Sequence, residues 1–123
     1  MHLGFVSFWK LYFFMRESAK KKDILIMMER KHIIFSGDVQ GVGFRYRANY
    51  AAQGLGLTGY VRNLYNGKVE VEVQGEKDLI NRFLEQIYSG RYIHIEDIEV
   101  EIVPIVEDER SFCVRHDGYW KIS

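Results

Sequence analysis

Apolar side chains recur along residues 31–123 with two periodicities, one typical of strands and the other typical of helices. Residues 32–35 form a short β-branched and aromatic run that ends at a serine and a glycine, which predicts a first strand. Residues 60–64 predict a second strand, and the Asn66-Gly67 dipeptide that follows suits the positive φ angles of a tight hairpin turn. The strands on either side of this turn are therefore expected to be antiparallel neighbours.

The segment after the turn alternates between valine and long polar side chains. Its apolar positions are Val69, Val71 and Val73, and its polar positions are Glu70, Glu72 and Gln74. We expect the valines to meet a core and the polar side chains to face water, as in a half-exposed antiparallel sheet. Residues 98–102 alternate in the same way, with Glu99 and Glu101 on the solvent-exposed face. Phe112 and Val114 indicate a last short strand.

Two other stretches repeat their apolar residues at helical spacing. These positions are Phe44, Ala48, Ala51, Ala52 and Leu55 in the first stretch, and Leu79, Ile80, Phe83, Leu84 and Ile87 in the second. Gly54 and Gly56 are suited to ending the first helix. The predicted order is βαββαβ with a closing strand, which is typical of a ferredoxin-like α+β sandwich with an antiparallel sheet and both helices on one face.

The first 30 residues depart from this pattern and are predicted to be an N-terminal extension, helical or disordered, to a domain at 31–123. Residues 3–15 are apolar and aromatic, but this run is shorter than the roughly 20 residues that a membrane-spanning helix needs. Three interpretations stay open for the extension. It lies upstream of a true start at Met27 or Met28, it packs as a helix on the domain or its partner, or it anchors the chain to a membrane surface.

Composition narrows the classes of function. A chain of 123 residues with 47% hydrophobic and 28% charged residues suits one globular domain. Lys plus Arg and Asp plus Glu are equal at 17 each, so nothing indicates a nucleic-acid partner. The single Cys113 excludes an internal disulfide and is expected to be a structural or surface thiol in a cytoplasmic protein. His2, His32, His94 and His116 lack metal-ligand spacing, so we expect neither a metal nor a cofactor.

The residues between the first strand and the first helix, 37–45, have the composition of an anion-binding loop. Gly41 and Gly43 permit backbone conformations that turn successive N–H groups inward. The loop leads directly into a helix N-terminus, and Arg45 adds a fixed positive charge. The loop lacks the Lys and Ser/Thr of a nucleotide-binding P-loop, so a compact phosphate group suits it better. These residues alone equally allow a plain strand-to-helix turn with a solvated arginine.

Two motifs resemble the signatures of one family. Residues 39–45, VQGVGFR, resemble the signature loop of the acylphosphatases. Residues 59–63, GYVRN, followed by GKV at 67–69 and by Gly75, resemble the second signature of the same family in the same order. The likeness covers about residues 31–116. On this basis the chain is identified as a member of the acylphosphatase family.

The resemblance implies a ferredoxin-like domain that hydrolyses the carboxyl–phosphate bond of acyl phosphates to a carboxylate and inorganic phosphate. It also implies that Arg45 and Asn63 are catalytic, with Asn63 orienting the attacking water, although an asparagine beside a hairpin is equally typical of a turn. The implied phosphate-binding loop consists of Gln40, Gly41, Val42, Gly43, Phe44 and Arg45. A small acyl phosphate is the expected substrate, phosphate or sulfate is expected to fit the loop, and the protein is expected to be a monomer without a membrane span.

Two alternative functions compete with this one. A non-catalytic ferredoxin-like module could bind an anion or RNA, but an RNA-binding sheet usually exposes aromatic residues on basic strands. The third strand is instead expected to expose two glutamates and a glutamine. An acylphosphatase-like domain of a larger carbamoyl-transfer protein would continue into cysteine-rich zinc modules, whereas this sequence has one cysteine and ends at Ser123. A free-standing enzyme is therefore expected.

Overall fold

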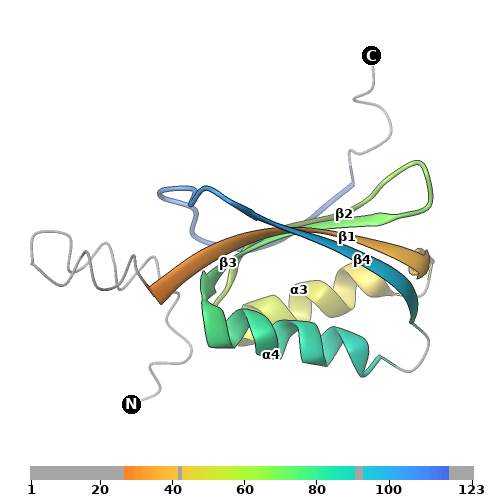
Figure 1. Cartoon of the computed structure of the whole chain (residues 1–123), viewed down its shortest axis with the longest axis horizontal. Coiled ribbons are helices and arrows are strands. Elements are labelled where there is room, and N and C mark those ends of the chain that lie inside the picture. The colour runs from red at the N-terminus through yellow and green to blue at the C-terminus, as the bar shows by residue number, and fades with distance from the viewer. Residues whose placement is uncertain (1–26, 42, 91–92, 117–123) are drawn as a thin grey trace, which may run out of the picture.

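A five-stranded sheet with two helices on one of its faces makes up the described part of the chain (Figure 1). The computed structural model describes residues 27–41, 43–90 and 93–116. In chain order its elements are β1 (Met28–Asp38), α3 (Phe44–Gly54), β2 (Thr58–Asn63), β3 (Val69–Glu76), α4 (Lys77–Tyr88), β4 (His94–Val103) and β5 (Phe112–Arg115). The predicted βαββαβ order with a closing strand is confirmed.

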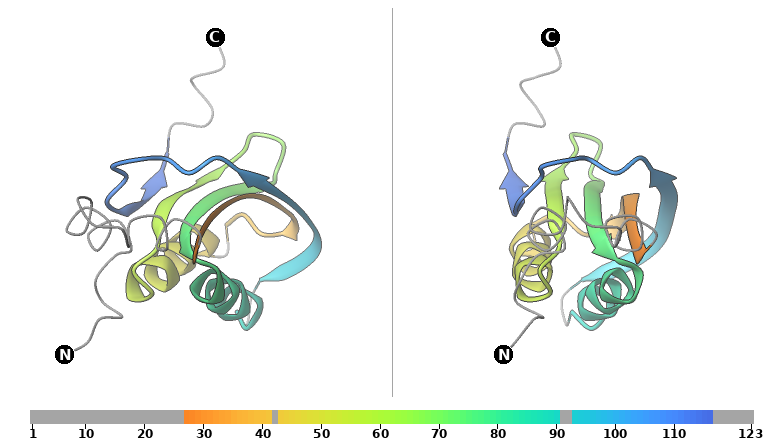
Figure 2. Two further views of the ribbon diagram at one scale, coloured as in Figure 1. Left: turned by 60° about the vertical axis from the view of Figure 1, so that its left-hand side comes forward. Right: turned by 90° about the vertical axis from the view of Figure 1, so that its left-hand side faces the viewer.

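The strands lie in the order β4-β1-β3-β2-β5, and the two helices lie side by side beneath the sheet (Figure 2). β1 pairs antiparallel with β3 and β4, and β2 pairs antiparallel with β3. β5 pairs parallel with β2, so the sheet is mixed, although a wholly antiparallel sheet was expected. The parallel pairing requires the long connection from β4 across the sheet, which the strand pattern in the sequence did not reveal.

The core lies between the sheet and the helices. Phe35 of β1 and Phe44 of α3 are buried there with ring centroids 4.9 Å apart, at the point where the chain passes from strand to helix. The helical apolar positions predicted from the sequence are buried or partly buried against this core. Val100 and Ile102 of β4, which the alternation placed on the core face, are instead 50% and 69% exposed on this edge strand.

The first strand begins earlier than the sequence indicated. β1 starts at Met28, which pairs with Glu76 of β3, so residues 28–30 belong to the sheet although they were assigned to the extension. The charged run Glu29-Arg30-Lys31 hid this start, because it lacks the apolar alternation of a strand. The remainder of the predicted extension, residues 1–26, lies outside the described residues.

The predicted hairpin between β2 and β3 is confirmed, but its turn is wider than expected. Five residues, 64–68, separate the two strands, and the Leu64 N–H donates to the Lys68 carbonyl at 2.8 Å. Gly67 has φ 90°, whereas Asn66 keeps a negative φ and its side chain accepts a hydrogen bond from the Lys68 N–H at 3.1 Å. A two-residue turn would need positive φ at both positions.

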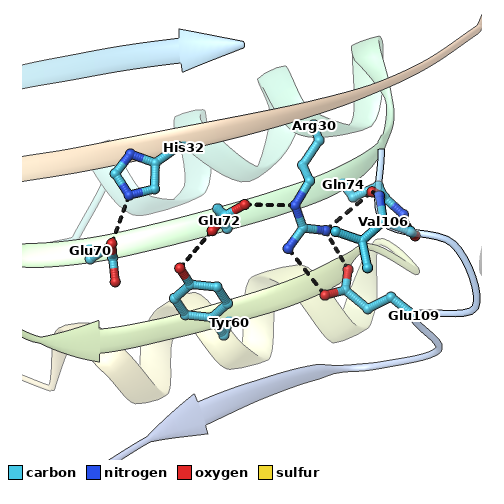
Figure 3. A network of polar contacts seen from close by, with 8 residues as sticks. All are labelled: Arg30, His32, Tyr60, Glu70, Glu72, Gln74, Val106 and Glu109. Atoms are coloured by element: carbon cyan, nitrogen blue, oxygen red, sulfur yellow. Dashed lines mark hydrogen bonds and ion pairs between the residues drawn. The ribbon is translucent and has the colours of Figure 1, made fainter. Parts of the chain in front are cut away.

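The polar side of β3 does not face water as the sequence analysis expected. Glu70 and Gln74 are 8% and 1% exposed, and Glu72 is half-buried. They belong to a polar layer on the sheet face opposite the helices (Figure 3). The expectation failed because partners on other strands and on the β4–β5 connection cover these side chains. Glu99 and Glu101 of the edge strand are exposed, as expected.

The centre of this polar layer is Arg30, whose side chain is 3% exposed. Its Nε donates to Glu72 Oε1 at 2.8 Å, and its Nη1 donates to Glu109 Oε1 at 2.7 Å and to Gln74 Oε1 at 3.1 Å. The Tyr60 hydroxyl donates to the second oxygen of Glu72 at 2.6 Å. We call Arg30, Tyr60, Glu72, Gln74 and Glu109 the outer-face network; it joins β1, β2 and β3 to the β4–β5 connection.

The network shifts the pKa values of three of its members, Arg30, Tyr60 and Glu72. Burial by itself raises the pKa of the Glu72 carboxyl, but the hydrogen bonds from Tyr60 and Arg30 outweigh burial and hold this pKa below its ordinary value. Burial and the hydrogen bond to Glu72 raise the pKa of the Tyr60 hydroxyl well above its ordinary value. Glu72 is therefore held as an anion and Tyr60 as a neutral donor.

Candidate active site

The segment between β1 and α3 ends in a helix start without a side-chain cap. Gly43 directly precedes α3 with φ 80°, and Gly41 has φ 74°. No side chain caps the first turn, and no acidic residue lies in it. The N–H groups of this turn are therefore left without a side-chain acceptor, and the helix dipole adds positive potential there. Such a helix start favours an anion.

Glycine is needed at positions 41 and 43 because of backbone conformation rather than space. A Cβ atom built at either position would meet no heavy atom within 4 Å. Both φ angles, however, lie in the left-handed region, where a side chain costs about 1–2 kcal/mol. This conformation is the one that the sequence analysis expected for an anion-binding loop.

Gln40 connects the loop to the β2–β3 hairpin. Its side-chain Nε2 donates to the Leu64 carbonyl at 2.5 Å and to the Lys68 carbonyl at 2.8 Å. These two hydrogen bonds hold the loop against the end of β2, where Asn63 lies. The sequence indicated a role only for the backbone of Gln40, so this bridging role of its side chain was missed.

A cavity of about 160 Å³ lies where the loop, the start of α3 and the end of β2 meet. It is lined by Val39, Gly41, Gly43, Phe44, Arg45, Tyr46 and Asn63. Ligand pockets for drug-sized molecules measure roughly 300–1,000 Å³, so this cavity suits a small group. The structure thus brings Arg45 and Asn63 together, as the two motifs predicted.

Two cavity residues were not singled out from the sequence, and one predicted residue cannot be placed. Val39 is a buried residue directly after β1, and Tyr46 is 57% exposed in the first turn of α3. Val39 begins the first motif but was given no role there, and Tyr46 has no sequence signal of its own, since a tyrosine on a helix surface is common. Val42 of the predicted loop lies outside the described residues.

The Arg45 side chain reaches the end of β5. Its Nη1 donates to the Arg115 carbonyl at 3.5 Å and lies 3.1 Å from Nδ1 of His116. The guanidinium makes no other hydrogen bond within the described residues. Its Nε and Nη2 can therefore donate to a ligand in the cavity, which Arg45 lines. The sequence had presented His116 only as an unsuitable metal ligand.

Asn63 brings a polar group into the cavity at the last position of β2. Its Oδ1 is buried and has no hydrogen-bond partner among the residues that the structure describes. Buried acceptors in native proteins are usually satisfied, so one that lines a cavity is suited to a donor that enters it. A water molecule or a ligand N–H could fill this role.

A larger hollow of about 320 Å³ lies between the two helices and is lined by Arg47, Tyr50, Ala51, Gln86 and Ser89. The Arg47 guanidinium is used within the fold, because Nε donates to the Gln86 carbonyl at 3.1 Å and Nη2 donates to Ser89 Oγ at 3.2 Å. This hollow contains neither a glycine loop nor a helix start. It is a weaker anion site than the cavity at Arg45.

In residues 27–41, 43–90 and 93–116, no group of three or more His, Cys, Asp or Glu side chains could hold a metal ion. Neither helix is long and apolar enough to cross a membrane. Cys113 is exposed on β5, which agrees with a surface thiol.

A model of the acylphosphatase family matches residues 31–114. The chain belongs to the acylphosphatase family. An acylphosphatase of Clostridium beijerinckii is 40% identical over 90 residues, which cover 72% of this chain and 100% of that relative. The crystal structure of acylphosphatase from Bacillus subtilis has a TM-score of 0.67 and 32% identity, and the match covers 72% of this chain and 99% of that one.

These matches confirm the predicted family, the ferredoxin-like fold and the activity, which is hydrolysis of acyl phosphates. Nothing favours the non-catalytic alternative. The acylphosphatase fold also forms a small part of a longer protein, full-length HypF in its phosphate- and nucleotide-bound form. That structure has a TM-score of 0.65 and 32% identity over 74% of this chain and 12% of the longer one.

Proposed function

We propose that the cavity at the start of α3 is the acylphosphatase active site, with Arg45 binding the phosphate and Asn63 placing the attacking water. One observation carries this assignment. The glycine loop with Arg45 forms one segment and Asn63 belongs to another, yet both segments line one cavity of about 160 Å³. A positive side chain, uncapped N–H groups and a buried acceptor therefore face the same small space.

The phosphoryl group would bind between the loop and Arg45. Phosphoryl transfer spreads negative charge over three equatorial oxygens, and prearranged donors stabilise that charge without reorganising. The N–H groups of Gly41, Gly43 and Phe44 are such donors, and the Arg45 guanidinium adds a bidentate pair. The same role for the backbone of Gln40 and Val42 rests on the family resemblance. Inorganic phosphate and sulfate are expected to bind here as well.

Asn63 would hold the water in line with the bond that breaks. A water O–H donates to Oδ1 of Asn63, which leaves a water lone pair directed at phosphorus, an orientation effect rather than proton abstraction. The phosphorus–oxygen bond to the carboxylate breaks as the new bond forms, and the departing carboxylate helps accept the water's proton. The products are a carboxylate and inorganic phosphate. Because the leaving group is already good, this chemistry requires neither a metal nor a covalent nucleophile.

We also propose that the protein is a monomer in the cytoplasm; its single cysteine suits a reducing compartment. An RNA partner is not favoured, because the acidic side chains of β3 are occupied by ion pairs within the sheet, such as Arg30 with Glu72 at 2.8 Å.

The assignment is tested by hydrolysis of benzoyl phosphate in the presence of a chelator. We expect Arg45→Gln and Asn63→Ala each to lower the rate by about a hundredfold or more, as removal of one transition-state donor does. Arg47→Gln and Asn49→Ala are matched controls on α3, because their side chains bond Gln86 and Gln53 away from the cavity. Near-normal rates in a folded Arg45 or Asn63 variant would remove that residue from the mechanism.

A further inference from the structure

Arg45 is held at one end by Arg115, the last residue of β5, and by His116, which directly follows it. Both contacts of its guanidinium, the Arg115 carbonyl at 3.5 Å and His116 Nδ1 at 3.1 Å, involve Nη1. We propose that His116 is a positioning residue that, with the Arg115 carbonyl, orients the Arg45 guanidinium for phosphate. This inference rests on the proposed role of Arg45, and it adds a part for the β5 terminus that neither motif contains.

The chemistry of guanidinium explains why the anchored nitrogen matters. Arginine carries five N–H donors in one plane, two of them on Nη1. When the two Nη1 hydrogens are directed to the Arg115 carbonyl and His116, the edge formed by Nε and Nη2 is left free. That edge is one of the two that bind two oxygens of a phosphate in parallel. Anchoring through Nη1 therefore leaves a bidentate edge for the substrate.

The contact sets the hydrogen-bonding role of His116. Arginine has donors only, so Nδ1 of His116 is the acceptor in this contact. The charged groups beside it on the sheet are Arg115, which directly precedes it, and Arg62, the ladder partner of Arg115 on β2. Arg62 is itself ion-paired with Glu70 of β3.

The end of β5 is itself held firmly enough to act as a support. Arg115 pairs with Arg62 in the parallel ladder, and its guanidinium carbon lies 3.9 Å from the centroid of the Tyr60 ring. The Tyr60 hydroxyl is bonded to Glu72, which also accepts from Arg30. The outer-face network thus fixes the ring on which Arg115 stacks, and through it the carbonyl that Arg45 contacts.

The expected effect of losing His116 is moderate because the contact is exposed. An unanchored arginine has to be ordered each time phosphate binds, and ordering one long side chain weakens binding by about two- to tenfold. The loss should appear mainly in KM for the acyl phosphate and in the inhibition constant for inorganic phosphate. kcat should change less, since the bound arginine makes the same contacts.

Three variants of the full chain separate positioning from other roles. His116→Leu removes the acceptor, whereas His116→Asn keeps an acceptor near the Nδ1 position and cannot titrate. His94→Leu is the matched control, because His94 is an exposed histidine on β4 at the opposite edge of the sheet. We expect His116→Leu to raise both constants by about two- to tenfold. His116→Asn and His94→Leu should stay near wild type.

Two readouts separate positioning from a purely structural role. In His116→Leu the KM should rise by a larger factor than kcat falls, and His116→Asn should recover the phosphate affinity of wild type. Equal phosphate affinity in wild type and His116→Leu would overturn the proposal. So would a His116→Asn variant that binds phosphate no better than His116→Leu, because the acceptor would then not matter.

Phosphate binding measured without turnover separates this inference from the proposed function. Titration with inorganic phosphate, followed by calorimetry, needs no acyl phosphate substrate. If wild type binds phosphate but does not hydrolyse benzoyl phosphate, the proposed function fails and the comparison of variants still decides the role of His116. If Arg45→Gln binds phosphate as well as wild type does, Arg45 is not a phosphate ligand and the positioning role falls with it.

Discussion

The side-chain amide of Gln40 donates to the Leu64 carbonyl at 2.5 Å, and this hydrogen bond joins the two motifs of the site. Gln40 belongs to the loop that leads to Arg45, whereas Leu64 directly follows Asn63 at the end of β2. A second bond to the Lys68 carbonyl at 2.8 Å fixes the same amide to the other side of the hairpin. The placement of the glycine loop relative to Asn63 therefore depends on one glutamine.

Gln40→Ala should lower kcat/KM by about ten- to a hundredfold, because misplacing reacting groups by 1 Å can cost a hundredfold. The free energy of unfolding should fall by about 1–3 kcal/mol, since two hydrogen bonds of about 0.5–1.5 kcal/mol each are lost. Steady-state kinetics and urea unfolding measure the two effects. Gln53→Ala is the control, because Gln53 bonds Asn49 on the exposed side of α3. Unchanged kinetics in Gln40→Ala would mean that the loop keeps its place without this bridge.

Substitution of Gly43 tests the loop conformation. Gly43→Ala should destabilise the fold by about 1–2 kcal/mol, because φ is 80° at this position. The rate of acyl phosphate hydrolysis should fall even where the variant is fully folded, since any relaxation of φ turns the first N–H groups of α3 away from the cavity. Gly54→Ala at the other end of α3 is the matched control. A Cβ atom there meets open space, and φ is not positive, so its stability should not fall.

The outer-face network predicts a pH dependence of stability. The folded-state pKa of Glu72 is lowered, so the stability that its charge contributes is present above the unfolded value of about 4.3 and is lost as pH falls through the folded pKa. Urea unfolding between pH 7 and pH 3 should show this loss in wild type. Glu72→Gln should lose about 1–3 kcal/mol at pH 7, the scale of hydrogen bonds to a charged group, and show a shallower decline.

Glu101→Gln provides the comparison for that experiment, because Glu101 is an exposed glutamate on the edge strand. Its stability should follow the wild-type curve from pH 7 to pH 3. A Glu72→Gln curve that runs parallel to wild type through the acid range would show that the Glu72 charge is not linked to folding. The hydrogen bonds from Tyr60 and Arg30 would then contribute less than the geometry implies.

The sequence predicted those features that depend on local periodicity. Both helices followed from apolar residues at helical spacing, and their inward faces include Ala48 and Phe83, which are fully buried. The hairpin followed from Asn66 and Gly67. The cavity residues Arg45 and Asn63 followed from two motifs, because each motif is contiguous in the chain.

The features that the sequence did not reveal depend on contacts between distant segments. In the sequence Arg30 stands in a charged run assigned to the N-terminal extension. In the structure it pairs with Glu109, which lies 79 residues further along the chain. Gln74 looked like a solvent-facing strand residue, but it bonds Val106 on the β4–β5 connection. His116 reaches Arg45 only because β5 returns parallel to β2. Alternation within one strand carries no information about which segment later covers its polar face.

The most direct test of the central assignment is to map inorganic phosphate on the wild-type protein by amide chemical shifts. Binding at the proposed active site predicts that the largest changes occur in the N–H groups of Gly41, Gly43 and Phe44 and in the Arg45 side chain. Changes concentrated instead at the hollow between the helices, around Arg47 and Ser89, would contradict the account. So would binding that leaves the start of α3 unaffected.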